Sequence, residues 1–331
     1  MAGWGDIAKE FAASAAQRQK QGVPGADADG IRRKYLASFS AATKRPAILY
    51  ASAWLTRQNA PDTGITLQDV HGLMEACRDL PGGDLDLIVH SPGGTAEGAA
   101  SLVHYLRERY QNIRVFVPLA AMSAATMWAL SANRIVMAKH SQLGPIDPQF
   151  VINDRNGVRQ VAASAILAQF EQAKKEISED PKTLGAWAQI LPQYGPGLLQ
   201  QCETAADLSK KLVREWLEQY MFAGQQDGAK RAEEIATFLG THETHQSHAM
   251  GVFREKLREL GVTIDDLEKT NQNEALSVFH ATMLTFATTP CVKLIENRQG
   301  RGYFPMQQQQ LQVPFQLIPQ PQPQQPKPGK P

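Results

Sequence analysis

The chain has 331 residues, 43% of them hydrophobic and 20% charged, and its 34 basic and 33 acidic side chains leave a formal net charge of +1. A chain of this length and composition can bury a sizeable core and has room for about two domains. The balanced charge gives no reason to expect nucleic acid or an anionic membrane surface as a partner. No run of about eighteen apolar residues occurs, so we expect no membrane span.

The cysteines give a first indication of the compartment. Cys77, Cys202 and Cys291 are far apart and belong to no paired motif, so they predict neither a disulfide framework nor a metal site. The N-terminus also lacks the basic segment followed by an apolar one that marks a secretory signal. We therefore expect a cytoplasmic protein.

The N-terminal segment predicts a helix that is set apart from the rest of the chain. Residues 3–20 have helical spacing of Ile7, Phe11 and Ala15, and the Gly-rich segment 22–30 then interrupts the pattern. This helix is either an arm that packs on a neighbouring subunit or a loosely held element. The arm is favoured because Trp4, Ile7 and Phe11 would otherwise be exposed.

Apolar, β-branched runs follow, and they predict a sheet. Runs at 87–89, 113–117 and 134–137 are separated by amphipathic or small-residue helical segments, the pattern of buried parallel strands joined by crossover helices. A strand at 47–51 and a helix at 66–78 precede them. That helix has one apolar face, which we expect to lie in the core: Leu67, Val70, Leu73, Met74 and Cys77.

The second half of the chain reads as largely helical. Beyond residue 147 a β-hairpin is predicted around Arg155 and Asn156. Helices are then expected at 163–178, 181–191, 205–222, 228–239, 252–260 and 272–286. Residues 307–331 contain ten Gln and seven Pro, a composition that cannot bury a core and indicates disorder with polyproline character.

Two loops at the carboxyl ends of the strands carry the residues for acyl transfer. Gly93 and Gly94 allow a sharp turn that points backbone N–H groups at a negative charge. Ser123 precedes a helix of small residues, so its hydroxyl meets the positive end of the helix dipole. By itself Ser123 would be read as a helix cap. With Gly94 and Ala124 as donors of an oxyanion hole, we interpret it as a nucleophile.

The order of these motifs resembles a known family. Ser91-Pro92-Gly93-Gly94 is followed by Ala121-Met122-Ser123-Ala124, then by Asn133-Arg134-Ile135-Val136 and Leu143-Gly144-Pro145-Ile146-Asp147. From about Ile31 to Thr289 the chain resembles the Clp-fold serine proteinases of the serine dehydrogenase proteinase family, relatives of signal peptide peptidase A. The resemblance implies an α/β fold of the ClpP/crotonase type, built of stacked ββα units. It also implies a cofactor-independent serine endopeptidase that acts on peptide or protein substrates as a homo-oligomer.

On this basis we divide the chain into three parts. Residues 1–30 form an N-terminal helical arm, residues 31–290 a Clp-fold serine peptidase domain with a helical C-terminal half, and residues 291–331 a Gln/Pro-rich disordered tail.

The general base is less clearly indicated. Relatives usually carry Gly where this chain has Ala125, and the ClpP branch has a His where this chain has residues 144–148, so a Ser-His-Asp triad on the ClpP pattern is not expected. The signal peptide peptidase branch uses a Lys, and Lys174 occupies the corresponding helix. Burial would have to lower its pKa from a reference of about 10.4 to near 7. The alternative is that Lys174 and Lys175 are an ordinary solvated pair.

Three further candidates have structural alternatives. Asp147 either orients a base or shapes the groove by accepting backbone N–H bonds. His90 either reaches the site or is an ordinary buried histidine. The segment with His242, His245 and His248 does not match the zinc-protease motif, and we read it as capping and packing, with no metal predicted.

The sequence therefore predicts a serine peptidase with Ser123 as nucleophile, Lys174 as base, and Gly94 and Ala124 as oxyanion donors. A catalytically silent Clp-fold scaffold that binds peptides or partner proteins is the alternative. An acyl-CoA enzyme of the crotonase type is a third interpretation, although such an enzyme does not need a serine at the start of a helix.

Overall fold

A seven-stranded sheet forms the centre of the computed structural model, which describes residues 2–57, 60–154, 157–241, 245, 247–269 and 274–306. The strand order is β10-β5-β3-β2-β1-β11-β12. Five neighbouring strands are parallel: β1 (Ala47–Ser52), β2 (Gly83–His90), β3 (Tyr110–Val117), β5 (Arg134–Met137) and β10 (Ile264–Asp266). The antiparallel strands β11 (Lys293–Asn297) and β12 (Gly302–Tyr303) complete one edge. The predicted parallel strands and the α/β class are thus confirmed.

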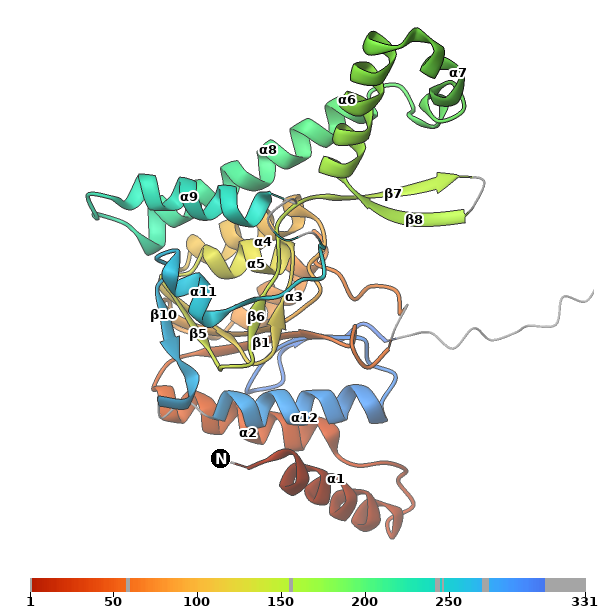
Figure 1. Ribbon diagram of the computed structural model, residues 1–331. Coiled ribbons are helices and arrows are strands. Elements are labelled where there is room, and N and C mark those ends of the chain that lie inside the picture. Colours follow the sequence, from red (N-terminus) through yellow and green to blue (C-terminus); the bar gives the residue numbers. More distant parts are fainter. Residues whose placement is uncertain are drawn as a thin grey trace, which may run out of the picture.

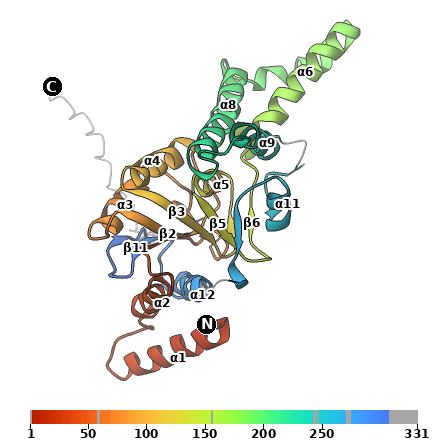
Figure 2. The same ribbon diagram turned by 90° about the vertical axis from the view of Figure 1, so that its left-hand side faces the viewer.

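Helices cover both faces of this sheet (Figures 1 and 2). One face packs against α3 (Asp69–Cys77), α4 (Ala96–Arg107) and α5 (Ala124–Leu130). The other packs against α2 (Ala28–Thr43) and α12 (Glu274–Thr288). The division follows the alternation of side chains along each strand. Leu87 and Val89 face the first helix layer, and Ile88 between them faces the second.

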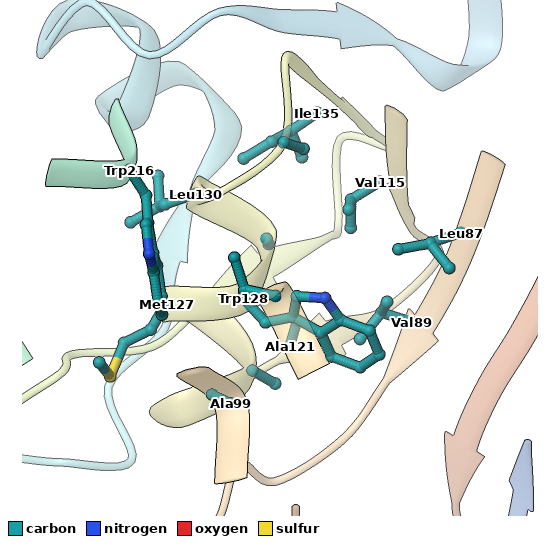
Figure 3. Close-up of a cluster of buried hydrophobic side chains, with 14 of the residues drawn as sticks. Leu87, Val89, Ala99, Val115, Ala121, Met127, Trp128, Leu130, Ile135 and Trp216 are labelled. Carbon is teal, nitrogen blue, oxygen red and sulfur yellow. The ribbon is translucent and has the colours of Figure 1, made fainter. Parts of the chain in front are cut away.

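The larger core lies beneath α4 and α5 (Figure 3). Trp128 of α5 is 1% exposed and lies close to Val89 and Ala121, while Tyr50 meets its ring edge to face at 5.0 Å. Every residue of α5 is buried. Its small residues let the helix approach the strand ends closely, and Trp128 contributes on the order of 2–3 kcal/mol through burial. The start of α5 is therefore firmly fixed.

The C-terminal half contains the expected helices, with different bounds. They are α6 (Ala163–Glu179), α7 (Leu184–Trp187), α8 (Leu198–Trp216), α9 (Gly228–Gly240) and α11 (Arg254–Glu259). The predicted hairpin is present as β7 (Gln149–Asp154) and β8 (Gly157–Ala162), and its turn lies outside the described residues. The hairpin, α6 and α7 project from the body of the molecule (Figure 1). A small apolar cluster joins the hairpin and α6 to α8.

A short second sheet extends the strand ends of the main one. It consists of β4 (Ala120–Ala121), β6 (Gln142–Leu143) and β9 (Val252–Phe253). The helix predicted from residue 252 therefore begins only at Arg254, because Val252 and Phe253 pair with β6 instead.

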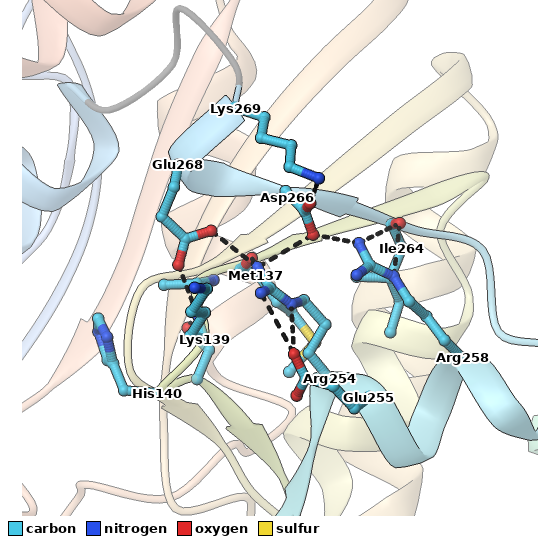
Figure 4. A network of polar contacts seen from close by, with 12 residues as sticks. Met137, Lys139, His140, Arg254, Glu255, Arg258, Ile264, Asp266, Glu268 and Lys269 are labelled. Carbon is cyan, nitrogen blue, oxygen red and sulfur yellow. Dashed lines mark hydrogen bonds and ion pairs between the residues drawn. The ribbon is translucent and has the colours of Figure 1, made fainter.

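Arg254 secures the chain that follows this second sheet (Figure 4). Its side chain is 3% exposed and donates to the Met137 carbonyl at 3.0 Å and to Glu268 at 2.7 Å. Hydrogen bonds from Lys269 and Arg258 lower the pKa of Asp266 to about 2. These charge-assisted bonds fasten the edge strand β10 to β5.

Two expectations about the ends of the chain are corrected. The N-terminal helix α1 (Trp4–Gln19) packs on its own chain: Ile7 and Phe11 are buried with residues of α2 and α12, so it is neither loosely held nor left without a surface to cover. At the other end, the predicted tail begins too early, because residues 293–297 form β11 and pair with β1. The Gln/Pro-rich residues 307–331 lie outside the described residues.

The prediction of which residues form the buried face of α3 is wrong in part. Leu73 and Cys77 are in the core as expected, whereas Leu67 and Met74 are 67% and 50% exposed. The helix begins at Asp69, after Leu67, so the periodicity read from residue 66 does not apply to its first apolar residue. Of the helices in the described segments, none combines the length and apolar character needed to cross a bilayer.

Candidate active site

Ser123 lies at a strained turn between β4 and α5. Its backbone has φ 51° and ψ −121°, a conformation that a residue with a side chain rarely adopts. It occupies the N-cap position of α5, yet its side chain makes no capping hydrogen bond. The hydroxyl therefore does not perform the ordinary structural task of a serine at this place. The buried helix behind it holds the strained turn in position.

Gly93 and Gly94 bring a second loop against Ser123. Their φ angles are +101° and +154°. A Cβ added to Gly93 would lie 2.7 Å from the Ser123 Cβ and 2.9 Å from the Ala124 nitrogen. A Cβ added to Gly94 would overlap the backbone of Ile65. Only glycine fits at either position, because both the backbone angles and the available space exclude a side chain.

Two backbone N–H groups near Ser123 are left for a ligand. Gly94 donates to no backbone acceptor in the described part of the chain, whereas its neighbour Thr95 donates to Ile65. Ala124 is the first residue of α5, so its N–H has no acceptor within the helix. The positive end of the helix dipole adds to the attraction of both groups for an anion.

A hydroxyl of α5 fixes the turn from behind. Thr126 Oγ1 donates to the Ala121 carbonyl at 2.7 Å and accepts from the Gly144 N–H at 2.8 Å. A Cβ on Gly144 would lie 3.1 Å from the Ser123 nitrogen. The segment that follows β6 therefore passes directly beside the nucleophile candidate.

A cavity of about 210 Å³ opens at Ser123. Its lining comes from the glycine loop and α4, from α5, from the segment 146–150 and from α8. The residues are Gly94, Thr95, Ala96, Glu97, Ser123, Ala124, Met127, Ile146, Pro148, Gln149, Phe150, Ala205, Leu208 and Ser209. The far wall is mostly apolar, and Glu97 is the one ionisable side chain of this lining.

Asp147 lies between two residues that line this cavity and is paired with a histidine. The Nδ1 atom of His248 is 2.7 Å from Asp147 Oδ1, and Gln149 Nε2 donates to Oδ2 at 3.0 Å. The Asp147 side chain is 2% exposed and that of His248 27%. A carboxylate accepts in such a bond, so the proton of this bond belongs to Nδ1.

The second sheet brings the segments of Asp147 and His248 together. Leu143 lies opposite Val252 in an antiparallel pair. Asp147 lies four residues after Leu143 and His248 four residues before Val252, so the antiparallel pair brings the two segments near each other. Sequence reasoning assigned His248 to capping and packing, and it missed this contact because the two residues are 101 positions apart.

Lys174 and His90 do not join Ser123 in this chain. Lys174 is 61% exposed on α6, and its Nζ pairs with Glu171 at 2.9 Å. It therefore lacks the burial that a lysine base needs. His90 is 1% exposed on the opposite face of the sheet, where its ring contacts Trp54 and Phe279. Burial lowers the pKa of His90 to about 4, so this histidine is neutral.

The histidine-rich segment shows no metal geometry where it is described. His245 is buried, its Nε2 lies 2.8 Å from the Phe238 carbonyl, and its ring packs on Phe238. His242 lies outside the described residues. Within the described ranges, no three His, Cys, Asp or Glu side chains gather as metal ligands would.

The family model for ClpP-like SDH-type serine proteinases matches residues 63–190. The match contains both the glycine loop and the strained serine turn. Over these residues the chain is similar to that family. The resemblance read from the sequence motifs is thereby confirmed, and the ClpP-like fold with it.

Two uncharacterized proteins of Methanocaldococcus jannaschii, MJ1495 and MJ0137, are similar to this chain. They are 27% and 28% identical to it over 225 and 204 residues, which are 66% and 61% of this chain. The matches cover 65% and 60% of the relatives, so the chain spans less than two thirds of the length of either.

Two solved structures of the 1510-N membrane-bound stomatin-specific protease also match. One is a serine-to-alanine mutant, with 15% identity and a TM-score of 0.35 over 61% of this chain and 75% of that chain. The other is a lysine-to-alanine mutant in complex with a substrate peptide, with 16% identity and a TM-score of 0.35 over 61% and 71%.

Proposed function

We propose that this protein is a serine endopeptidase and that Ser123 is its nucleophile. The observation that carries the proposal is the backbone of Ser123, which is strained, uncapped and pressed against Gly93 at the mouth of a cavity. A strained serine turn at a helix start presents the hydroxyl to a substrate instead of to the protein.

In the proposed reaction Ser123 Oγ attacks a peptide carbonyl carbon. The N–H groups of Gly94 and Ala124 stabilise the oxygen as it becomes negative, which lowers the barrier. The amine then leaves with a proton, and water hydrolyses the ester that remains on Ser123.

We assign the general base to His248, oriented by Asp147. His248 Nε2 takes the Ser123 proton and later gives it to the leaving amine, while the Asp147 carboxylate stabilises the imidazolium that forms between these steps. The support is the 2.7 Å contact between the two side chains and the position of Asp147 between Ile146 and Pro148, both of which line the cavity. The rival base is Lys174, which a second copy of the chain would have to supply.

Labelling with a fluorophosphonate probe tests the nucleophile and the base together. We expect an adduct on Ser123 that is lost in Ser123→Ala. Removing a general base lowers rates by about 10²–10⁴, so we expect His248→Ala to label that much more slowly and Lys174→Ala to label like the wild type. His71→Ala, which changes an exposed histidine on α3, is the matched control.

Each other result has a clear meaning. Slow labelling of Lys174→Ala with normal labelling of His248→Ala would transfer the role of base to Lys174. No adduct on the folded wild-type protein would refute the peptidase proposal and favour a binding scaffold. Binding of acyl-CoA, seen as thermal stabilisation, would favour the crotonase-type reaction.

We further propose a cytoplasmic homo-oligomer as the working form. The support is the projecting hairpin and α6, which offer surface for a second copy (Figure 1), together with the three buried free cysteines, which suit a reducing compartment. Light scattering of the purified protein tests the assembly, and a monomer at working concentration would contradict it.

A further inference from the structure

A buried ion pair lies behind the glycine loop. Lys293 of β11 and Asp69 of α3 are 2% and 1% exposed. Lys293 Nζ donates to Asp69 Oδ1 at 2.8 Å and to the Gly64 carbonyl at 2.7 Å. Asp69 also accepts from the Tyr50 hydroxyl at 2.8 Å and from the Thr66 N–H at 3.0 Å. The group is fully buried, and neither charged side chain lines the Ser123 cavity.

These bonds hold the chain on both sides of Ile65. Lys293 holds the carbonyl of Gly64, the residue before Ile65. Asp69 holds the N–H of Thr66, the residue after it. A segment of three residues is thus clamped at both ends to side chains from two other elements.

Ile65 in turn holds the proposed oxyanion loop. Its N–H donates to the Gly93 carbonyl at 2.6 Å, and its carbonyl accepts from the Thr95 N–H at 3.0 Å. Gly94 lies between these two bonds and forms a parallel bridge with Ile65. The direction of the Gly94 N–H is therefore set by Ile65, and the position of Ile65 is set by the ion pair.

Burying two charges this deeply needs a reason. Desolvation costs several kcal/mol for each ion, and apolar replacements of similar volume are often equally stable. Stability alone therefore does not explain why Lys293 and Asp69 are present. An oxyanion donor, by contrast, must lie within about 2.7–3.1 Å of the developing charge, and a misplacement of about 1 Å can cost 10²-fold in rate.

We propose that Lys293 and Asp69 are positioning residues that hold the Gly94 N–H in place for the transition state. The inference rests on the proposed peptidase function. It assigns to the ion pair a role in kcat that is separate from folding and from substrate binding.

The test replaces the whole pair by apolar side chains, which leaves no unpaired charge. We expect Asp69→Leu/Lys293→Met to fold and to retain KM within about twofold, while kcat for a peptide substrate falls about 10- to 100-fold. The matched control is Arg32→Met/Glu296→Gln. It changes a second buried pair, in which Glu296 of the same strand β11 bonds to Arg32 of α2 and not to the segment that holds the glycine loop. The control should retain kcat.

Tyr50→Phe is measured beside the double variant because it removes a single hydrogen bond to Asp69 and keeps the ring packed on Trp128. We expect the same pattern at smaller size, with kcat down about 3- to 10-fold, since one net hydrogen bond is worth on the order of 1 kcal/mol. This variant answers the question if the double variant does not fold.

Several outcomes would overturn the inference. They are an unchanged kcat in Tyr50→Phe or in the folded double variant, an equal loss in the Arg32/Glu296 control, or a loss confined to KM. In each of these cases wild-type Ser123 still labels and turns over, so the peptidase function survives. Absence of labelling in the wild type would overturn the peptidase function and the positioning role with it.

Discussion

The backbone strain at Ser123 can be measured as a difference between two substitutions. Its angles, φ 51° and ψ −121°, match the first central position of a type II′ turn, where glycine is strongly preferred. Ser123→Gly relieves the strain, while Ser123→Ala keeps it and removes only the hydroxyl. Both variants lose the proposed nucleophile, so the comparison isolates the backbone.

The expected magnitude follows from two opposing terms. A residue held in such a conformation costs on the order of 1–3 kcal/mol. Glycine in turn adds about 0.4–1 kcal/mol of conformational freedom to the unfolded chain. We therefore expect Ser123→Gly to unfold at a free energy about 0.5–2 kcal/mol higher than Ser123→Ala.

Urea unfolding, followed by tryptophan fluorescence, measures this difference as a shift in midpoint at constant slope. Trp128, on the helix that begins beside Ser123, is one of the five tryptophans that report the loss of the fold. If Ser123→Gly is no more stable than Ser123→Ala, then the turn stores no strain. The observation on which we base the nucleophile assignment would then lose its energetic meaning.

Two further substitutions test the glycine loop and the buried histidine His90. Gly93→Ala places a Cβ 2.6 Å from the Met122 carbonyl oxygen. We expect its unfolding free energy to fall by about 2–4 kcal/mol and Ser123 to lose its labelling. The control is Gly157→Ala, which has a similar φ but open space around it; its unfolding free energy should fall by only about 1–2 kcal/mol, and Ser123 should label normally. His90→Phe concerns acid stability: the native pKa of about 4 is below the ordinary 6.5, so His90 contributes stability that is present above pH 6.5 and lost as the pH falls through 4. Unfolding measured across this window should show a shallower decline in His90→Phe, by up to about 1.4 kcal/mol per pH unit, and an unchanged slope would contradict the neutral buried state.

The local features of this fold could be predicted from the sequence. The strands β2, β3 and β5 were readable because each is a short apolar run with β-branched residues, and the turn at Ser123 because small residues follow it directly. The glycine loop could be predicted because paired glycines favour a sharp turn with positive φ angles. Both loops follow neighbouring parallel strands, which is why their meeting at one edge could be inferred.

Contacts between distant segments could not be predicted in the same way. The pairing of Asp147 with His248 depends on the register of β6 and β9, which are two residues long each and carry no periodic signal. Strand β11 was not predicted because the polar residues Lys293, Glu296 and Asn297 are typical of an exposed tail. In the structure all three are buried and bound to specific partners. Lys174 was favoured by the resemblance to the signal peptide peptidase branch and by helical spacing, and neither reveals which face of α6 has a partner.

The cavity at Ser123 has two walls that differ in how firmly they are built. The wall with the serine belongs to the large core beneath α4 and α5. Phe150, on the other wall, belongs to the hairpin, whose buried contacts form a small cluster with α6 and α8. Elements with few buried contacts open at a much lower free energy than a central core does. Opening of the hairpin side would widen the cavity for an extended peptide and leave the geometry of Ser123 unchanged. In the proposed peptidase, the part of the molecule that admits the substrate would then differ from the part that positions the nucleophile.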